Sequence, residues 1–229
     1  MHEVRIWDLP LRLFHWLLAL AVTGAMISGQ IGGNLMIWHG RLGVFVAGLL
    51  GFRLAWGLVG STHARFASFV RGPSAIHAYL RGQWHGLGHN PLGALSVLGM
   101  LTALGLQTLG GLFGNDDIAF QGPLYPLISK ETSDWVTGLH RKGFWLILLL
   151  VATHLAAIVF YLRVRGDNLI RPMITGRRHV AHPDAASPAH GGGAMALIFA
   201  LTVGVAAAYG ASGAWQAPPP PAPAAAPAW

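Results

Sequence analysis

Five apolar runs, each close to the length that crosses a lipid bilayer, limit the fold of this chain more than any other feature. A helix needs about 20 predominantly apolar residues to span the hydrocarbon core. Within lipid the backbone must satisfy its own hydrogen bonds, and a single run of this length does so as an α-helix. The runs cover residues 11–29, 36–59, 92–113, 135–162 and 194–213. We therefore predict an all-α protein: a transmembrane four-helix bundle with a fifth, C-terminal transmembrane helix.

The composition also indicates that lipid is the main solvent. Only 10% of the 229 residues are charged and 53% are hydrophobic, whereas a soluble domain carries about 25% charged residues. The net charge of +7 is then a topology signal and does not indicate nucleic-acid binding. The chain has no cysteine, which excludes disulfides, iron–sulfur clusters, covalently attached c-type haem and thiolate ligands.

Basic residues predict the orientation of the chain in a bacterial inner membrane. The N-terminal segment, the 60–90 loop and the 163–190 segment together hold ten Lys and Arg residues. The opposite side has Lys130, with Arg141 and Lys142 at the entrance of the fourth run. Because basic loops stay on the cytoplasmic side, we predict a cytoplasmic N-terminus. A signal peptide is the alternative for the first run, but the Phe14-His15-Trp16 sequence is bulkier and more polar than a signal core.

Four histidines in these runs fall into two pairs by depth. His140 and His154 lie fourteen residues apart, so on one helix they return to within about 40° of the same face, roughly 21 Å apart along the axis. His15 lies about a turn into the first run, near the cytoplasmic side. His39 begins the second run and His140 the fourth, both near the outer side, and His154 lies deep toward the cytoplasmic side. The depths therefore pair His15 with His154 and His39 with His140.

These pairs are typical of haem ligands. Imidazoles inside a membrane are costly and mark functional sites, and two neutral imidazoles on facing helices can bind haem iron from both sides. A hydrogen-bonded packing role is the alternative for any single histidine, but two depth-matched pairs favour iron ligation at an inner and an outer haem. Zinc is not favoured, because no acidic residue lies within a turn of the four histidines.

Other polar and small residues near the pairs are secondary candidates. Haem propionates need cations or water, and the basic candidates are Arg12, Arg41, Arg141 and Lys142, although interfacial anchoring explains them more simply. The glycines that would admit a macrocycle close to the backbone are Gly40, Gly43, Gly138 and Gly143, and ordinary helix packing explains these equally well.

Seven histidines in the segments between and after the first four membrane runs are expected to be solvated or to lie in a disordered basic segment, with weak metal binding as the alternative. They are His63, His77, His85, His89, His179, His182 and His190.

Ordered motifs run through the first three quarters of the chain. They are VRIWDLPLRLFHW at 4–16, WHGRLG at 38–43, FRLAWGLVGSTHARF at 52–66, HNPLGALSV at 89–97, GLFGNDD at 111–117, GPL at 122–124, LHRKGFW at 139–145, HLAAIVFY at 154–161 and NLIRPMITG at 168–176. With these motifs the chain resembles the bacterial cytochrome b561 family, in particular b-type cytochrome subunits similar to those of nickel–iron hydrogenases.

That resemblance covers roughly residues 3–177 and implies a four-helix bundle with two b haems, ligated by histidines of the first, second and fourth helices. These are the four histidines paired above. The resemblance also implies electron exchange between membrane quinone and a partner protein. Residues 178–229 match nothing in the core family.

The chain divides into four parts on these grounds. Residues 1–177 are the predicted dihaem cytochrome b membrane domain, 178–193 a cytoplasmic basic linker, 194–213 the extra transmembrane helix and 214–229 a Pro/Ala-rich disordered tail.

The predicted function is electron transfer between quinone or quinol and a periplasmic c-type cytochrome or hydrogenase subunit, with a second copy of the chain as a further candidate partner. No side chain is assigned to bond-making chemistry. Asp116, Asp117 and Asp134 are candidates for handling quinol protons, and a solvated loop explains them more simply. Two alternatives remain: a small-molecule:quinone oxidoreductase acting on an anion such as superoxide, and a haem-dependent sensor or assembly subunit whose tail recruits partners.

Overall fold

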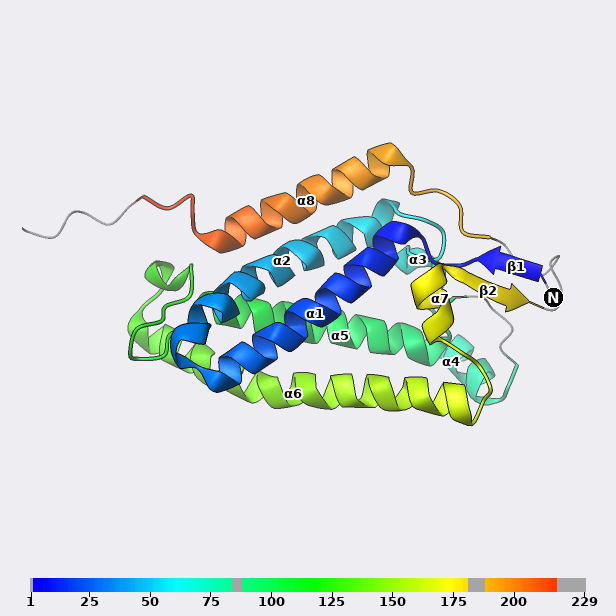
Figure 1. Cartoon of the computed structure of the whole chain (residues 1–229), viewed down its shortest axis with the longest axis horizontal. Coiled ribbons are helices and arrows are strands. Elements are labelled where there is room, and N and C mark those ends of the chain that lie inside the picture. Colours follow the sequence, from blue (N-terminus) through cyan, green and yellow to red (C-terminus); the bar gives the residue numbers. More distant parts are fainter. Residues whose placement is uncertain (1, 84–87, 181–187, 218–229) are drawn as a thin grey trace, which may run out of the picture.

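Five long apolar helices form the body of the protein (Figure 1). The computed structural model describes residues 2–83, 88–180 and 188–217. The long helices are α1 (Leu9–Ile31), α2 (Met36–Val59), α5 (Pro91–Leu112), α6 (Lys130–Arg163) and α8 (Ala194–Ser212). Each is long and apolar enough to cross a membrane, which confirms the predicted helical membrane fold.

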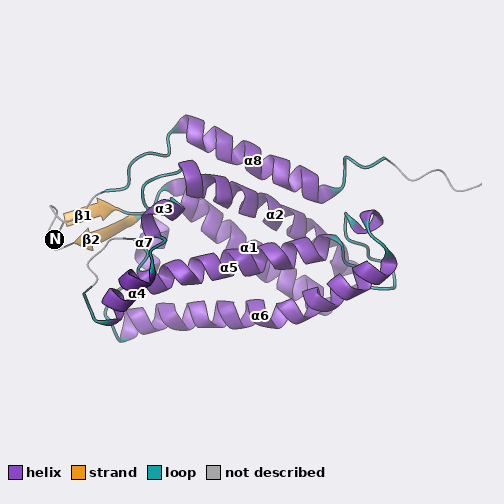
Figure 2. Ribbon diagram, turned by 180° about the vertical axis from the view of Figure 1, so that it is seen from behind, coloured by secondary structure: helices purple, strands orange, loops and turns teal. Residues whose placement is uncertain are grey.

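Short elements connect the long helices and gather at the two ends of the bundle (Figures 1 and 2). At one end lie strand β1 (His2–Arg5), helices α3 (Phe66–Phe69), α4 (Pro73–Leu80) and α7 (Ile170–Thr175), and strand β2 (Arg177–Val180). The 3₁₀ turn η1 (Gly33–Leu35) joins α1 to α2, and η2 (Tyr125–Leu127) precedes α6. Because the first end holds the more basic connections, we expect it to be cytoplasmic, and we call it the inner end.

Side-chain caps decide where three of the long helices begin. The Asp8 carboxylate accepts a hydrogen bond from the Leu11 amide at 2.6 Å, and the Asn90 side chain caps α5 in the same way. Ser129 caps α6 through the Thr132 amide at 3.3 Å. The start predicted at residue 135 was therefore five residues late, because the first turns of α6 are polar and lie outside the apolar run. His140 accordingly lies well within α6 rather than at its start.

Close backbone packing joins α1 to α2, α2 to α5, α5 to α6 and α2 to α8. The centre of the bundle is an apolar cluster drawn from α1, α2, α5 and α6, formed by Ala21, Val46, Leu50, Leu104 and Ile147. A second cluster at the inner end holds Phe14, Phe52 and Trp56 among its buried residues. These contacts fix the depths at which α1, α2 and α6 present their histidines.

Small residues let α8 approach α2 closely. A Cβ placed on Gly51 of α2 would lie 2.6 Å from the Ala207 Cβ of α8, and one on Gly48 would lie 3.0 Å from Ala208. Membrane helices associate through such stripes of small residues, because van der Waals packing replaces the hydrophobic effect there. The predicted extra helix at 194–213 is thus an integral part of the bundle, and α8 runs back from the inner end to the opposite one (Figure 1).

A two-stranded sheet at the inner end was not predicted. Strands β1 and β2 pair antiparallel, with His2 opposite Val180 and Arg5 opposite Arg177. The expectation that His179 belongs to a disordered segment was therefore wrong. His190 is held as well, since its carbonyl accepts a hydrogen bond from the Thr62 amide at 2.8 Å. His85, His182 and the tail beyond residue 217 lie outside the described residues.

Candidate functional site

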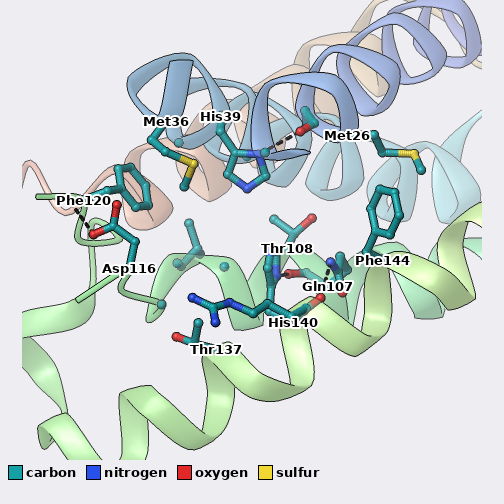
Figure 3. Close-up of a pocket in the computed structure, with 18 of the residues that line it drawn as sticks. Met26, Met36, His39, Gln107, Thr108, Asp116, Phe120, Thr137, His140 and Phe144 are labelled. Atoms are coloured by element: carbon teal, nitrogen blue, oxygen red, sulfur yellow. Dashed lines mark hydrogen bonds between the residues drawn. The ribbon is translucent and has the colours of Figure 1, made fainter. Parts of the chain in front are cut away.

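His39 of α2 and His140 of α6 face each other, as their predicted pairing requires (Figure 3). Their ring centroids lie 5.9 Å apart, with the ring planes at 86°. A metal–nitrogen bond of about 2 Å, plus about 1.1 Å from the nitrogen to the ring centre, places two opposed axial imidazoles roughly 6 Å apart. The spacing therefore fits one iron held between the two rings.

Both rings of this outer pair are oriented by backbone carbonyls. His39 Nδ1 lies 2.8 Å from the Ala25 carbonyl oxygen of α1, and His140 Nδ1 lies 2.8 Å from the Gln107 carbonyl oxygen of α5. Since a carbonyl only accepts, each Nδ1 carries the proton and donates it. Each Nε2 then keeps its lone pair for a metal, as in metal sites where the second ring nitrogen is hydrogen-bonded to a backbone carbonyl.

A glycine accompanies each of these carbonyls one helical turn later. A Cβ on Gly29 would lie 2.8 Å from His39 Nδ1, and one on Gly111 would lie 2.9 Å from His140 Cε1. Real Cβ atoms essentially never approach so closely. The same arrangement therefore seats both rings: an imidazole lies over a glycine and donates to the carbonyl four residues before it.

A cavity of about 630 Å³ lies between the two rings. It is lined mainly by apolar side chains and glycines of α1, α2, α5 and α6, with Asp116 and Arg141 at its polar part. Ligand pockets for small molecules and cofactors span roughly 300–1,000 Å³. Gly43 lines the cavity, and its Cβ position meets open space within the described part of the chain. Volume, lining and donor set together fit a bis-histidine haem.

The second pair, His15 of α1 and His154 of α6, lies nearer the inner end. Its ring centroids are 6.4 Å apart with the planes at 50°, which also fits a single iron between the rings. His15 Nδ1 is buried and has no hydrogen-bond partner among the described residues. The Trp16 indole donates to the Met173 carbonyl at 3.3 Å, so the α7 segment covers this end of α1.

The structure places some of the basic and glycine candidates at the outer cavity and others away from it. Of the outer basic residues, Arg141 lines the cavity, whereas the Arg41 guanidinium lies 5.0 Å over the Trp38 ring, an arrangement typical of interfacial anchoring. Arg12 lies by the inner pair and donates to the Ile174 carbonyl. Of the four glycines, Gly40 and Gly43 line the cavity, while Gly138 and Gly143 do not.

The three acidic candidates lie in the loop before α6 or in its first turns. The Asp116 carboxylate lines the outer cavity and accepts hydrogen bonds of 2.8–2.9 Å from the amides of Ile118, Ala119 and Phe120. These amides hold the pKa of Asp116 below its ordinary value, the Phe120 amide most strongly. Asp117 and Asp134 both pair with Lys130, at 2.7 and 2.8 Å. Asp116 alone of the three lines the cavity.

His89 differs most from its prediction. It was expected to be solvated, but its ring packs 4.6 Å from Trp7 and 4.9 Å from Phe69, centroid to centroid. Its Nδ1 is buried without a partner among the described residues. Burial, followed by the positive charge of Arg53, lowers the pKa of His89 to about 3. No sequence pattern distinguished this histidine from His77, which is exposed.

Sequence reasoning missed the residues that orient the outer histidine pair. The third apolar run lacks histidine, yet Gln107 in α5 accepts from His140 Nδ1 and donates from its own side chain to the His140 carbonyl at 2.9 Å. The nearest available signal was the position of the glycines: Gly29 and Gly111 lie near the ends of α1 and α5, at the depth of the outer histidines.

Comparison with known proteins gives consistent matches over the same region. The family profile described as prokaryotic cytochrome b561 matches residues 6–176. A probable Ni/Fe-hydrogenase B-type cytochrome subunit of Azotobacter vinelandii is 30% identical, over 76% of this chain and 88% of the relative. The protein of the same name from Cupriavidus necator is 26% identical, over 76% and 86%.

A probable Ni/Fe-hydrogenase 1 B-type cytochrome subunit of Escherichia coli K12 is 22% identical, over 76% of this chain and 89% of the relative. No solved structure matches the chain significantly. Strand β2, α8 and the C-terminal tail lie beyond the region that the family profile matches.

Proposed function

The chain belongs to the prokaryotic cytochrome b561 family, and we propose that it is a dihaem membrane electron carrier between the quinone pool and a periplasmic redox partner. When bound, each haem would supply a one-electron redox centre. The observation that carries the proposal is the pair of histidine couples, 5.9 and 6.4 Å between ring centroids, which share one helix. His15 and His154 would hold the inner haem, and His39 and His140 the outer one.

Helix α6 sets the distance over which electrons would travel. It is continuous from Lys130 to Arg163, so the fourteen residues from His140 to His154 place the two iron ligands roughly 21 Å apart along its axis. Because a porphyrin is wide, two macrocycles held at these levels would be near neighbours. Electron passage across the bilayer would then need no moving element of the chain.

Sidedness and the names of the relatives support the proposed partner. Positive-inside placement puts the N-terminus in the cytoplasm, so the outer pair would face the periplasm. Relatives of this chain are named as Ni/Fe-hydrogenase subunits, which favours a hydrogenase subunit as the electron partner, with a c-type cytochrome as the other candidate. Quinol oxidation releases protons, and Asp116 lines the outer cavity, but the amides that lower its pKa make its carboxylate a weak proton acceptor.

Haem counting in purified full-length protein tests the ligand assignment. Pyridine haemochrome analysis is expected to give two b haems per chain. His39→Ala and His140→Ala should each remove the outer haem alone, and His15→Ala and His154→Ala the inner one alone. His77→Ala, at an exposed position of α4, is the matched control and should retain both haems. One haem or none in the unmutated protein would contradict the paired sites.

Electron exchange is tested separately. The absorbance bands of the reduced haems are followed when quinol is added, and then when an oxidised c-type cytochrome is added. In the opposite direction, a hydrogenase supplied with hydrogen serves as the electron donor. We expect a quinone analogue and one of the protein partners to exchange electrons at catalytic rates. If quinol reduces neither haem and quinone oxidises neither, the quinone link is wrong.

One observation favours a second candidate, direct reaction of the outer haem with a small anion such as superoxide. The Arg141 side chain lines the outer cavity, and a cationic cavity wall attracts anionic reactants. Superoxide generated in the presence of quinone would then reduce the haems, and Arg141→Gln would slow that reaction without changing the rate with quinol.

A further inference from the structure

Buried nitrogen atoms without a hydrogen-bond partner gather at the inner end of the bundle. Among the described residues, four buried side-chain polar atoms lack a partner: Arg12 Nε, His15 Nδ1, Arg53 Nη1 and His89 Nδ1. All four are nitrogens, and two belong to guanidinium groups that cannot lose their charge. Buried polar groups are nearly always paired, so a cluster of unmatched donors at one place points to a missing acceptor.

Arg53 is the strongest member of this cluster, which we call the inner donor cluster. It is only 2% exposed, and its guanidinium lies 4.7 Å over the Phe66 ring and 6.0 Å from the Phe69 ring. The ion pairs of the described residues involve neither Arg53 nor Arg12. An aromatic face attracts a cation, but it does not replace a hydrogen-bond acceptor for the N–H groups. Arg53 therefore remains a buried charge whose Nη1 has no hydrogen-bond partner among the described residues.

The nearest carboxylate does not supply the missing acceptor. Asp8 attracts Arg53 electrostatically, but its two oxygens are already engaged. One accepts from the Leu11 amide at 2.6 Å, and the other from the Trp56 indole at 3.1 Å and the Ser61 hydroxyl. Asp8 therefore fastens the start of α1 to the end of α2 and leaves the remaining donors of Arg53 to another group.

Geometry places the cluster level with the inner histidine pair. The rings of Phe14 and Phe52, the residues preceding His15 and Arg53, are in contact, with centroids 6.2 Å apart and planes tilted by 31°. The Phe69 ring joins Arg53 to His89, 4.9 Å away. The side chains that lower the pKa of His89 include Arg53, His15 and His154, so the His89 ring lies near the inner histidine pair.

The missing acceptor is thus anionic, rich in oxygen and adjacent to His15 and His154. Guanidinium groups bind carboxylates with two parallel hydrogen bonds. The four atoms without a partner are all nitrogens that can donate a hydrogen bond. We infer that Arg53 and Arg12 bind the propionate carboxylates of the inner haem, with His89 donating a further hydrogen bond from Nδ1. This inference rests on the proposed dihaem function.

Arg53 then has a positioning and tuning role that differs from packing. A cation beside a haem propionate partly offsets the effect of the propionate's negative charge on the iron. The cation would therefore favour the reduced state of the haem. Removal of that cation should lower the reduction equilibrium constant of the inner haem about tenfold, which is a potential shift of about 59 mV for a one-electron couple. The outer haem, roughly 21 Å away along α6, should change much less.

The test is a redox titration with resonance Raman spectroscopy of the purified full-length protein. The variants are Arg53→Gln, Arg53→Lys, Arg12→Gln and His89→Phe, the last of which keeps a ring between Trp7 and Phe69. Arg65→Gln is the control for loss of charge, because Arg65 is exposed in the connection between α2 and α3. We expect Arg53→Gln to lower the inner potential and shift the propionate bending bands of the inner haem. Arg53→Lys should restore most of the potential, and Arg65→Gln should change neither quantity.

Each other outcome overturns the inference. An unchanged inner potential and unchanged propionate bands in the folded Arg53→Gln, Arg12→Gln and His89→Phe proteins would show that the cluster does not bind propionates. Unchanged haem spectra combined with slower reduction by quinol would assign the cluster to quinone instead. If the unmutated protein holds no inner haem, the dihaem proposal itself fails, which haem counting reveals before any variant is made. Should Arg53→Gln not fold, Arg53→Lys and Arg12→Gln decide the matter.

Discussion

Gly29→Ala is the sharpest test of the outer site, because one methyl group acts directly on His39, a proposed iron ligand. The new Cβ would lie 2.8 Å from His39 Nδ1 and 2.9 Å from Cε1, where ordinary contact begins at 3.4 Å. The imidazole must therefore withdraw by about 0.6 Å, and its hydrogen bond to the Ala25 carbonyl would lengthen from 2.8 Å to about 3.4 Å, beyond the normal range. Loss of such a hydrogen bond typically weakens metal affinity 10–100-fold, or by about 1.4–2.8 kcal/mol.

The assay for Gly29→Ala is the rate at which the outer haem is lost to excess apomyoglobin, with pyridine haemochrome analysis of the remainder. We expect outer-haem loss to accelerate by one to two orders of magnitude, while the inner haem stays. Gly138→Ala on α6 is the matched control, since its Cβ would meet no described atom within 4 Å. Alanine is the better helix former by about 1 kcal/mol, so propensity alone would stabilise both variants. Equal haem retention in the two proteins would refute the proposed seating of His39.

Three further predictions concern the fold around the sites. Gly51→Leu should overpack the contact with α8 and lower stability by about 1–3 kcal/mol, seen as a lower thermal midpoint in detergent, whereas Gly210→Ala should not, because its Cβ meets open space within the described part of the chain. Asp8→Ala removes the cap of α1 and should cost about 1–2 kcal/mol in chemical unfolding, with an unchanged midpoint as the contradicting result. Burial, and then the hydrogen bond with Tyr161, raise the pKa of Tyr79 to about 12 from 10.0, so the stability from this contact is complete below pH 10 and is lost as the pH rises through 12. Ultraviolet titration should show Tyr161→Phe moving the Tyr79 transition to lower pH, and an unmoved transition would exclude the contact.

Helix periodicity and charge asymmetry were enough to pair the four histidines from the sequence. His140 and His154 lie on one face because a single helix carries both, and the turns between helices set His15 and His39 at different depths. The start of α6 could not be placed from hydropathy, because the segment beginning at Lys130 is polar and is held by a cap at Ser129. An apolar run marks the part of a helix that lies in lipid, whereas the capped, polar start of the helix lies outside that run.

Interactions between distant segments were the part that sequence reasoning could not reach. Pairing of β1 with β2 joins the two segments that flank the matched region on either side, and short polar strands carry no periodic signal of their own. The burial of His89 depends on Trp7 and Phe69, which are far from it in the sequence. The roles of Gly29 and Gly111 likewise depend on which ring is placed over each glycine, and that is a property of helix packing.

The hydrogen bonds of the outer histidine pair each stay within one helical hairpin. His39 is tied to α1 within the α1–α2 hairpin, and His140 is tied to α5 within the α5–α6 hairpin. Each proposed iron site, however, takes one ligand from the first hairpin and one from α6. Haem binding would therefore link the two hairpins at two levels. Neither link can form before α6, the last of these four helices, has entered the membrane. Cofactor supply would in this way add to the packing of α2 against α5, which already joins the two hairpins.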